Sequence, residues 1–187
     1  MDRRKIILKG DINMNIYKEY QKLKLDKSYI GLEEGDTEGG YFCTPIGAKI
    51  IGWESGGIHY CFIDGFNEIV FAVNPNGSID DNGEEKNVYP LAENFKIFLQ
   101  LILATSSVTP IEQIIYLSKE RFEGFIVSEY NTILPEHQEV LNNLQKKLDL
   151  TPFETPYEYV KELQYKFDYS RIKFTEEYYD ALGIDMP

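Results

Sequence analysis

The stretch that decides the fold is residues 58–74, which read IHYCFIDGFNEIVFAVN. It holds two short runs rich in β-branched and aromatic residues, 58–63 and 68–74, which are typical of strands. The connection 64–67 is short enough for a hairpin, so the two strands should run antiparallel. Residues 69–73 are apolar on both faces, which predicts a central strand covered on both sides.

Further strands are expected on either side of this hairpin. Residues 41–44 and 49–53 are short, apolar or aromatic, and bounded by Gly, Pro, Asn or Asp. A brief strand at 88–89 should follow the polar turn 74–87. These patterns predict a twisted antiparallel sheet of about five strands.

The chain becomes helical after Pro90. An apolar stripe at helical spacing should rest on the sheet, formed by Leu91, Phe95, Phe98, Leu99, Ile102 and Leu103. Two capping boxes, Thr109 to Glu112 and Thr155 to Glu158, each predict a helix start. Helices are also expected over 119–130, 135–148 and 175–182, and a short amphipathic one from Met14. Strands followed by a run of helices indicate an α+β fold with a helical C-terminal half.

The length of 187 residues suits one well-buried core, and no linker divides it, so residues 1–187 should form a single domain. Residues 1–13 are expected to be upstream or disordered. Lys9-Gly10-Asp11 can be encoded by a ribosome-binding sequence, which suggests that translation starts at Met14. The rival interpretation is an ordered first strand over 5–8.

The charge of the chain is −12, and it is uneven: eight Lys/Arg against four Asp/Glu through Lys27 leave −16 for the remainder. An acidic body repels nucleic-acid phosphates and attracts a basic protein, although acidity also simply maintains solubility. No apolar run approaches the roughly 20 residues of a membrane span. Cys43 and Cys61 lie in apolar runs and should be buried free thiols, which favours the cytoplasm.

A catalytic, metal or cofactor site is not expected. His59 should lie in a strand on the face opposite Tyr60, and His137 should be a surface residue. Neither has metal-ligand spacing to a cysteine or another histidine. The cluster Gly52 to Gly57 joins two strands and lacks the Lys-Ser/Thr ending of a phosphate loop, so it is better explained as a tight turn.

Acidic side chains and one tryptophan are the candidates for a partner-binding surface. Four acids lie in a polar loop over 31–40, and four more form the densest acidic tip in the chain. The predicted partner-binding residues are Glu33, Glu34, Asp36, Glu38, Trp53, Glu54, Asp80, Asp81, Glu84 and Glu85. The aromatic C-terminal stretch, Tyr157 to Tyr179, is expected to be a strap over the sheet, with an exposed contact face as the alternative.

Three segments carry a family resemblance: GWESGGIHYCFI over 52–63, VFAVNP over 70–75 and VYPLAENFKIFL over 88–99. Together they resemble the SUKH superfamily, which contains Smi/Knr-type glucan-synthesis regulators and many bacterial immunity proteins. The resemblance covers about residues 41–103, and the C-terminal half resembles a subfamily from Gram-positive bacteria. An earlier helix with a Leu-Pro start, usual in the family, is not found here.

The resemblance implies an intracellular, non-catalytic α+β module that binds proteins, often neutralising a nuclease toxin. Since such toxins tend to be basic, we expect an immunity protein that binds a basic toxin stoichiometrically. The alternative is a regulatory or scaffolding module of the Smi/Knr type that binds a cellular partner. The sequence leaves the oligomeric state open.

Overall fold

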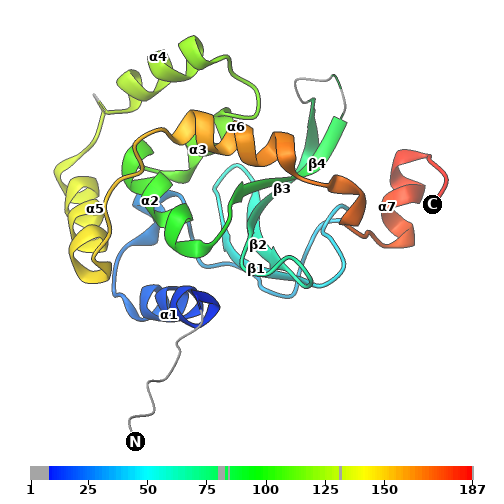
Figure 1. Ribbon diagram of the computed structural model, residues 1–187, viewed down its shortest axis with the longest axis horizontal. Helices are drawn as coiled ribbons and strands as arrows, with labels where there is room; N and C mark the ends of the chain where they lie inside the picture. The colour runs from blue at the N-terminus through cyan, green and yellow to red at the C-terminus, as the bar shows by residue number, and fades with distance from the viewer. Residues whose placement is uncertain (1–8, 80–82, 84, 131, 187) are drawn as a thin grey trace, which may run out of the picture.

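The sheet at the centre of the molecule is antiparallel, with four strands in the order β1-β2-β3-β4 (Figure 1). The structure is a computed structural model and describes residues 9–79, 83, 85–130 and 132–186. The strands are β1 (Ala48–Trp53), β2 (His59–Ile63), β3 (Val70–Ile79) and β4 (Glu85–Ala92). The α+β class is confirmed, with four strands in place of about five.

The hairpin predicted around residues 64–67 is confirmed. His59 pairs with Val73 and Cys61 with Phe71 in antiparallel register. Gly65 at the turn has a φ of +87°, in the left-handed region where glycine is favoured. The hairpin places β2 and β3 in the middle of the sheet, as their apolar residues require.

The strand predicted at 41–44 was wrong. This segment closes on itself: the Thr44 amide donates to the Tyr41 carbonyl at 2.9 Å, and the Tyr41 amide donates to Thr44 Oγ1 at 2.7 Å. The threonine side chain therefore takes a backbone donor that a strand would need for pairing. This turn accounts for the difference between the five predicted strands and the four observed.

The β3–β4 hairpin is longer than predicted. Beyond Val73 the register shifts around Pro75, which has no amide proton to donate, and pairing resumes at Ser78 with Lys86 and Ile79 with Glu85. The segment 74–87 is thus largely two strands rather than a turn. It projects past the end of β1 and β2 (Figure 1).

Helices follow the sheet as expected. The elements are α1 (Lys9–Lys22), the 3₁₀ turn η1 (Lys27–Ile30), α2 (Phe95–Thr105), α3 (Val108–Gln113), α4 (Lys119–Tyr130), α5 (Pro135–Leu148), α6 (Pro156–Lys166), the 3₁₀ turn η2 (Tyr169–Arg171) and α7 (Glu176–Leu182). α1 begins at Lys9, earlier than the predicted start at Met14, and the alternative strand over 5–8 lies outside the described residues.

The two capping boxes mark helix starts but do not form the predicted bonds. Ser107 rather than Thr109 precedes α3, and Thr155 precedes α6 without a side-chain cap. Glu112 turns inward, and Glu158 pairs with Lys119. α2 has a true cap, because Asn94 accepts from the Ile97 amide at 3.0 Å.

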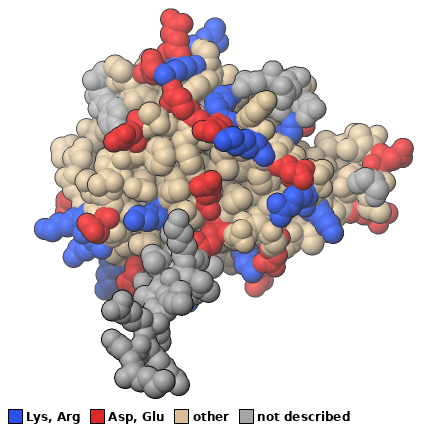
Figure 2. Space-filling model, in the orientation of Figure 1, with Lys and Arg blue, Asp and Glu red and all other residues tan. Residues whose placement is uncertain are grey.

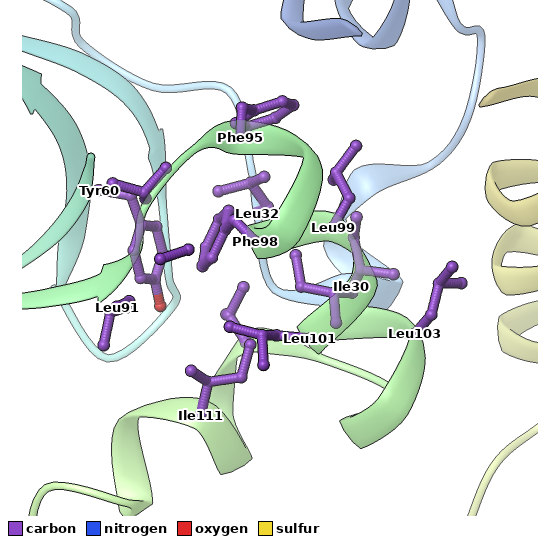
Figure 3. Packing of buried hydrophobic residues seen from close by; sticks show 14 of the residues in the cluster. Ile30, Leu32, Tyr60, Leu91, Phe95, Phe98, Leu99, Leu101, Leu103 and Ile111 are labelled. Carbon is purple, nitrogen blue, oxygen red and sulfur yellow. The ribbon is translucent and has the colours of Figure 1, made fainter. Parts of the chain in front are cut away.

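Two apolar clusters cover the two faces of the sheet. The larger joins β2 residues such as Tyr60 to α2 and α3 (Figure 3). All six residues of the predicted stripe are buried, but the expected helix after Pro90 was wrong at its start: Leu91 lies in β4, which pairs with β3 as far as Ala92, and only the other five residues belong to α2. The smaller joins Cys61 and Phe71 to Phe167 and Ile172 of the C-terminal segment. The predicted aromatic strap is confirmed here, since Phe167 packs on Phe71 with ring centroids 5.4 Å apart. Tyr165, 88% exposed, is the exception.

Candidate functional site

The loop over 31–40 is held against the edge strand β1. Glu33 and Trp53 exchange two backbone hydrogen bonds, of 2.8 and 2.9 Å. Trp53 Nε1 also donates to the Asp36 carbonyl at 2.8 Å. Gly35 allows this approach, because a Cβ there would lie 2.3 Å from Trp53 Cδ1. The loop therefore has a defined position around the tryptophan.

The acids of this loop are on the surface. Glu33, Glu34, Asp36 and Glu38 are exposed, and the predicted set is brought together with Trp53 and Glu54 at the end of β1. The Lys27 ammonium, hydrogen-bonded to Glu34 at 2.5 Å, lowers the pKa of that carboxyl. The amides of Glu38 and Gly39 lower the pKa of Asp36. Both groups are therefore charged at neutral pH.

The strand order places Glu85, the one described residue of the second predicted acidic segment, beyond the same end of the sheet. β3 runs antiparallel to β2, so its extension toward Ile79 passes the end of the sheet that also holds Trp53 and Glu54. Glu85 opens β4 there and is exposed. Asp80, Asp81 and Glu84 lie outside the described residues, so their placement is not assigned.

A cavity of about 320 Å³ lies beside this loop, between α1, η1 with the following loop, and β1. It is lined by Tyr17, Tyr20, Gln21, Lys27, Leu32, Glu34, Gly35, Thr37, Ile50, Ile51, Gly52 and Trp53. Tyr20 is only 2% exposed, and its hydroxyl has no hydrogen-bond partner within the described chain. Burial, together with nearby Tyr17 and Glu34, raises the Tyr20 pKa. No local pattern marks Tyr20 or Lys27 as a site residue, because only the fold places them beside β1.

The two histidines differ in their surroundings. His59 is fully buried between Tyr41 and Trp53, on the face opposite Tyr60 as predicted, and burial lowers its pKa to about 4. His137 is half-buried rather than a free surface residue: its Nε2 lies 2.8 Å from the Ser106 carbonyl, to which it donates. That contact joins α5 to the α2–α3 connection.

Glu112 is a buried carboxyl that the sequence analysis assigned to a helix cap. It is 3% exposed, and its Oε1 accepts a hydrogen bond from the Tyr60 hydroxyl. Burial and, secondarily, Glu54 raise its pKa to about 9, so it is protonated at neutral pH. Tyr60 stands among the core residues around Phe98 (Figure 3), so this pair belongs to the interior. The sequence offered one indication that this carboxyl is buried: Glu112 is the only charged residue in the largely apolar segment 108–115.

The remaining predictions concern cysteines, metals and membranes. Cys43 and Cys61 are buried free thiols, and burial raises both pKa values, that of Cys43 to about 11. Among the residues that the structure describes, no group of three or more His, Cys, Asp or Glu is arranged to hold a metal ion. None of the helices in that part of the chain has both the length and the apolar character needed to cross a membrane.

Comparisons with protein families, with curated proteins and with solved structures found no match to this chain. The SUKH resemblance therefore stays a prediction from the sequence.

Proposed function

We propose that this chain is a non-catalytic, cytoplasmic protein-binding module that neutralises a basic, nuclease-type toxin by stoichiometric binding. The observation that carries the proposal is the set of exposed acids in the loop held beside Trp53, at the end of the sheet past which β3 extends. Glu33, Asp36 and Glu38 come from the loop. The half-buried Glu54 directly follows β1, and the exposed Glu85 opens β4 beyond that end of the sheet.

The mechanism we propose is occlusion. Carboxylates fixed at the end of the sheet take the places that nucleic-acid phosphates would occupy on the toxin, and they steer the encounter electrostatically. Trp53 supplies the aromatic anchor around which the contact is desolvated. The buried polar groups, His59 and Glu112, stabilise the fold in this proposal and take no part in chemistry.

A second candidate, a regulatory or scaffolding module of the Smi/Knr type, is favoured by a different surface. Three apolar side chains at the C-terminus are exposed: Leu182 by 42%, Ile184 by 52% and Met186 by 64%. In Figure 2 the part of the molecule that projects at the right carries acidic but no basic side chains, whereas acids and bases are mixed elsewhere on that face. An apolar contact there would bind a cellular partner independently of salt.

The experiment is affinity purification of the tagged protein from its native cells, with bound proteins identified at low and high salt. A basic protein with a toxin domain, recovered stoichiometrically and released by salt, is the expected result. A salt-resistant cellular partner would instead support the regulatory module, and recovery of the chain alone would contradict both.

Matched variants locate the contact. Glu33→Lys, Glu38→Lys and Glu85→Lys combined should abolish the recovery of a basic partner, because each reversal places like charges at the interface. Glu176→Lys, Glu177→Lys and Asp180→Lys on α7 change the net charge equally and should leave recovery intact. If both triple variants lost the partner equally, net charge alone, and not this surface, would be what attracts it.

A further inference from the structure

Over most of its length the outer edge of β1 has no backbone hydrogen-bond partner among the described residues. At one end Trp53 pairs with Glu33, and at the other the Ile46 amide donates to the Lys173 carbonyl at 2.8 Å. Between these points the described chain makes no backbone hydrogen bond across that edge. Strand edges offer backbone donors and acceptors that an added strand can use. The Glu33 bridge already shows the antiparallel direction that such a strand would follow.

The cavity lies along this open edge. Its lining includes four consecutive residues of β1, from Ile50 to Trp53, together with α1 and the loop. Leu32, Ile50 and Ile51 supply apolar surface to the cavity. The cavity thus fits one large apolar side chain together with the peptide group beside it.

The charges around the cavity select the occupant. Glu33, Asp36 and Glu38 are exposed on the loop that contributes Glu34, Gly35 and Thr37 to the cavity lining, and we call these loop acids the acidic rim. Two lysines nearby are paired, Lys27 with Glu34 at 2.5 Å and Lys49 with Asp64 at 2.6 Å. A second copy of this chain would bring the same acidic rim and the same Lys49 to the contact, so like charges would oppose pairing. A segment with basic residues on either side of its apolar residue is complementary to this rim.

We infer that β1 is the docking edge for an extended, basic segment of a partner protein, which adds to the sheet as a strand and inserts one apolar side chain into the cavity. The inference rests on the proposed function, the binding of a basic protein, and specifies the surface and the binding mode. Backbone pairing supplies affinity, the cavity fixes the register, and the acidic rim selects basic flanking residues.

The test uses the full chain and a defined probe, the peptide acetyl-Lys-Thr-Lys-Phe-Lys-Thr-Lys-amide. Binding should shift the backbone amide resonances of 49–53 and of the cavity residues. Two N-methylated peptides separate strand pairing from charge attraction, because each removes every second amide proton, in alternate phase. We expect one isomer to lose binding by at least about tenfold and the other to keep it, since only alternate amides of a strand face its neighbour.

Two charge variants of equal net change test the rim. Glu33→Lys with Glu38→Lys should weaken peptide binding by at least about tenfold, whereas Glu176→Lys with Glu177→Lys on α7 should change it by less than about threefold. The amide spectra of both variants report whether the fold is retained. A glutamate-for-lysine version of the peptide should not bind.

Three results would overturn the inference: equal binding of the two N-methylated isomers, resonance shifts that leave out 49–53, or no binding at millimolar peptide. Each can be told apart from failure of the proposed function. If a salt-sensitive basic protein is recovered from cells while the peptide fails, the acidic surface stands and the β1 edge is excluded. If the peptide binds the edge as expected and cells yield no basic partner, the toxin-neutralising proposal fails instead.

Discussion

Glu112 shows how burial changes the charge state of a single side chain. Its pKa of about 9 means that the folded chain binds a proton that the unfolded chain releases above pH about 4.5. This difference in proton binding sets the direction in which stability changes with pH. The contribution of Glu112 to stability is complete below the unfolded pKa and is lost as pH rises toward 9.

The first prediction is that Glu112→Gln removes this loss. The amide can still accept the hydrogen bond from Tyr60, and it has no proton to release. At pH 8 the variant should be more stable than the parent by on the order of 2 kcal/mol, and at pH 4.5 the two should be nearly equal. Urea unfolding at the two pH values measures the difference. If the free energies of unfolding of both proteins changed with pH in the same way, the raised pKa of Glu112 would be contradicted.

His59 has the opposite dependence. Burial lowers its pKa to about 4, so its contribution to stability is present above the unfolded pKa of about 6.5 and is lost as pH falls through 4. We predict that the His59 ring carbon resonances stay constant from pH 8 down to pH 5.5. An NMR titration checks this, and a midpoint near 6.5 would mean that the ring is hydrated.

At the scale of elements, the loop over 31–40 depends on the last residue of β1. Trp53 holds the Asp36 carbonyl by its indole N–H and covers His59 with its ring, at a centroid distance of 4.8 Å. The loop has a single backbone bridge to the sheet, at Glu33. Its position therefore rests largely on one side chain.

We predict that Trp53→Ala destabilises the fold by about 2–3 kcal/mol and accelerates amide exchange at Glu33 and Glu38. Tyr165→Ala is the matched control, because that aromatic ring is 88% exposed and its loss should cost less than about 0.5 kcal/mol. Hydrogen exchange and urea unfolding measure both effects. Unchanged exchange in the loop would show that its own turns hold it.

At the scale of the whole molecule, the sheet couples the two apolar clusters. Adjacent residues of β2, Tyr60 and Cys61, belong to opposite clusters, so neither cluster can lose its packing without loosening the strand that both share. The C-terminal segment closes the second cluster through Phe167 and Ile172, which ties the end of the chain to its centre.

The fourth prediction is therefore one cooperative unfolding transition. Far-ultraviolet circular dichroism, which follows the helices, and fluorescence of Trp53, which follows β1, should give the same urea midpoint. A separate early transition in the helical signal would show that the C-terminal half is a second folding unit.

Features that depend on a local pattern of residues could be predicted before the structure was known. Alternating and continuous apolar runs predicted β1, β2 and the core of β3. Helical spacing predicted the bounds of α4 and α5 and the buried stripe of α2, except that it also included Leu91 of β4. The turn at 41–44 was mistaken for a strand because a threonine side chain, invisible to hydrophobic pattern, takes its backbone donor. The acids were identified by composition alone.

Which of these residues lie close together depends on how the strands and helices pack. The antiparallel order of the strands brings the loop acids, Glu54 and Glu85 to one end of the sheet, although they are far apart in the chain. The open edge of β1, the cavity beside Tyr20 and the pairing of Glu112 with Tyr60 are likewise contacts between distant segments. Such contacts follow from how elements pack, and a local pattern carries no information about packing partners.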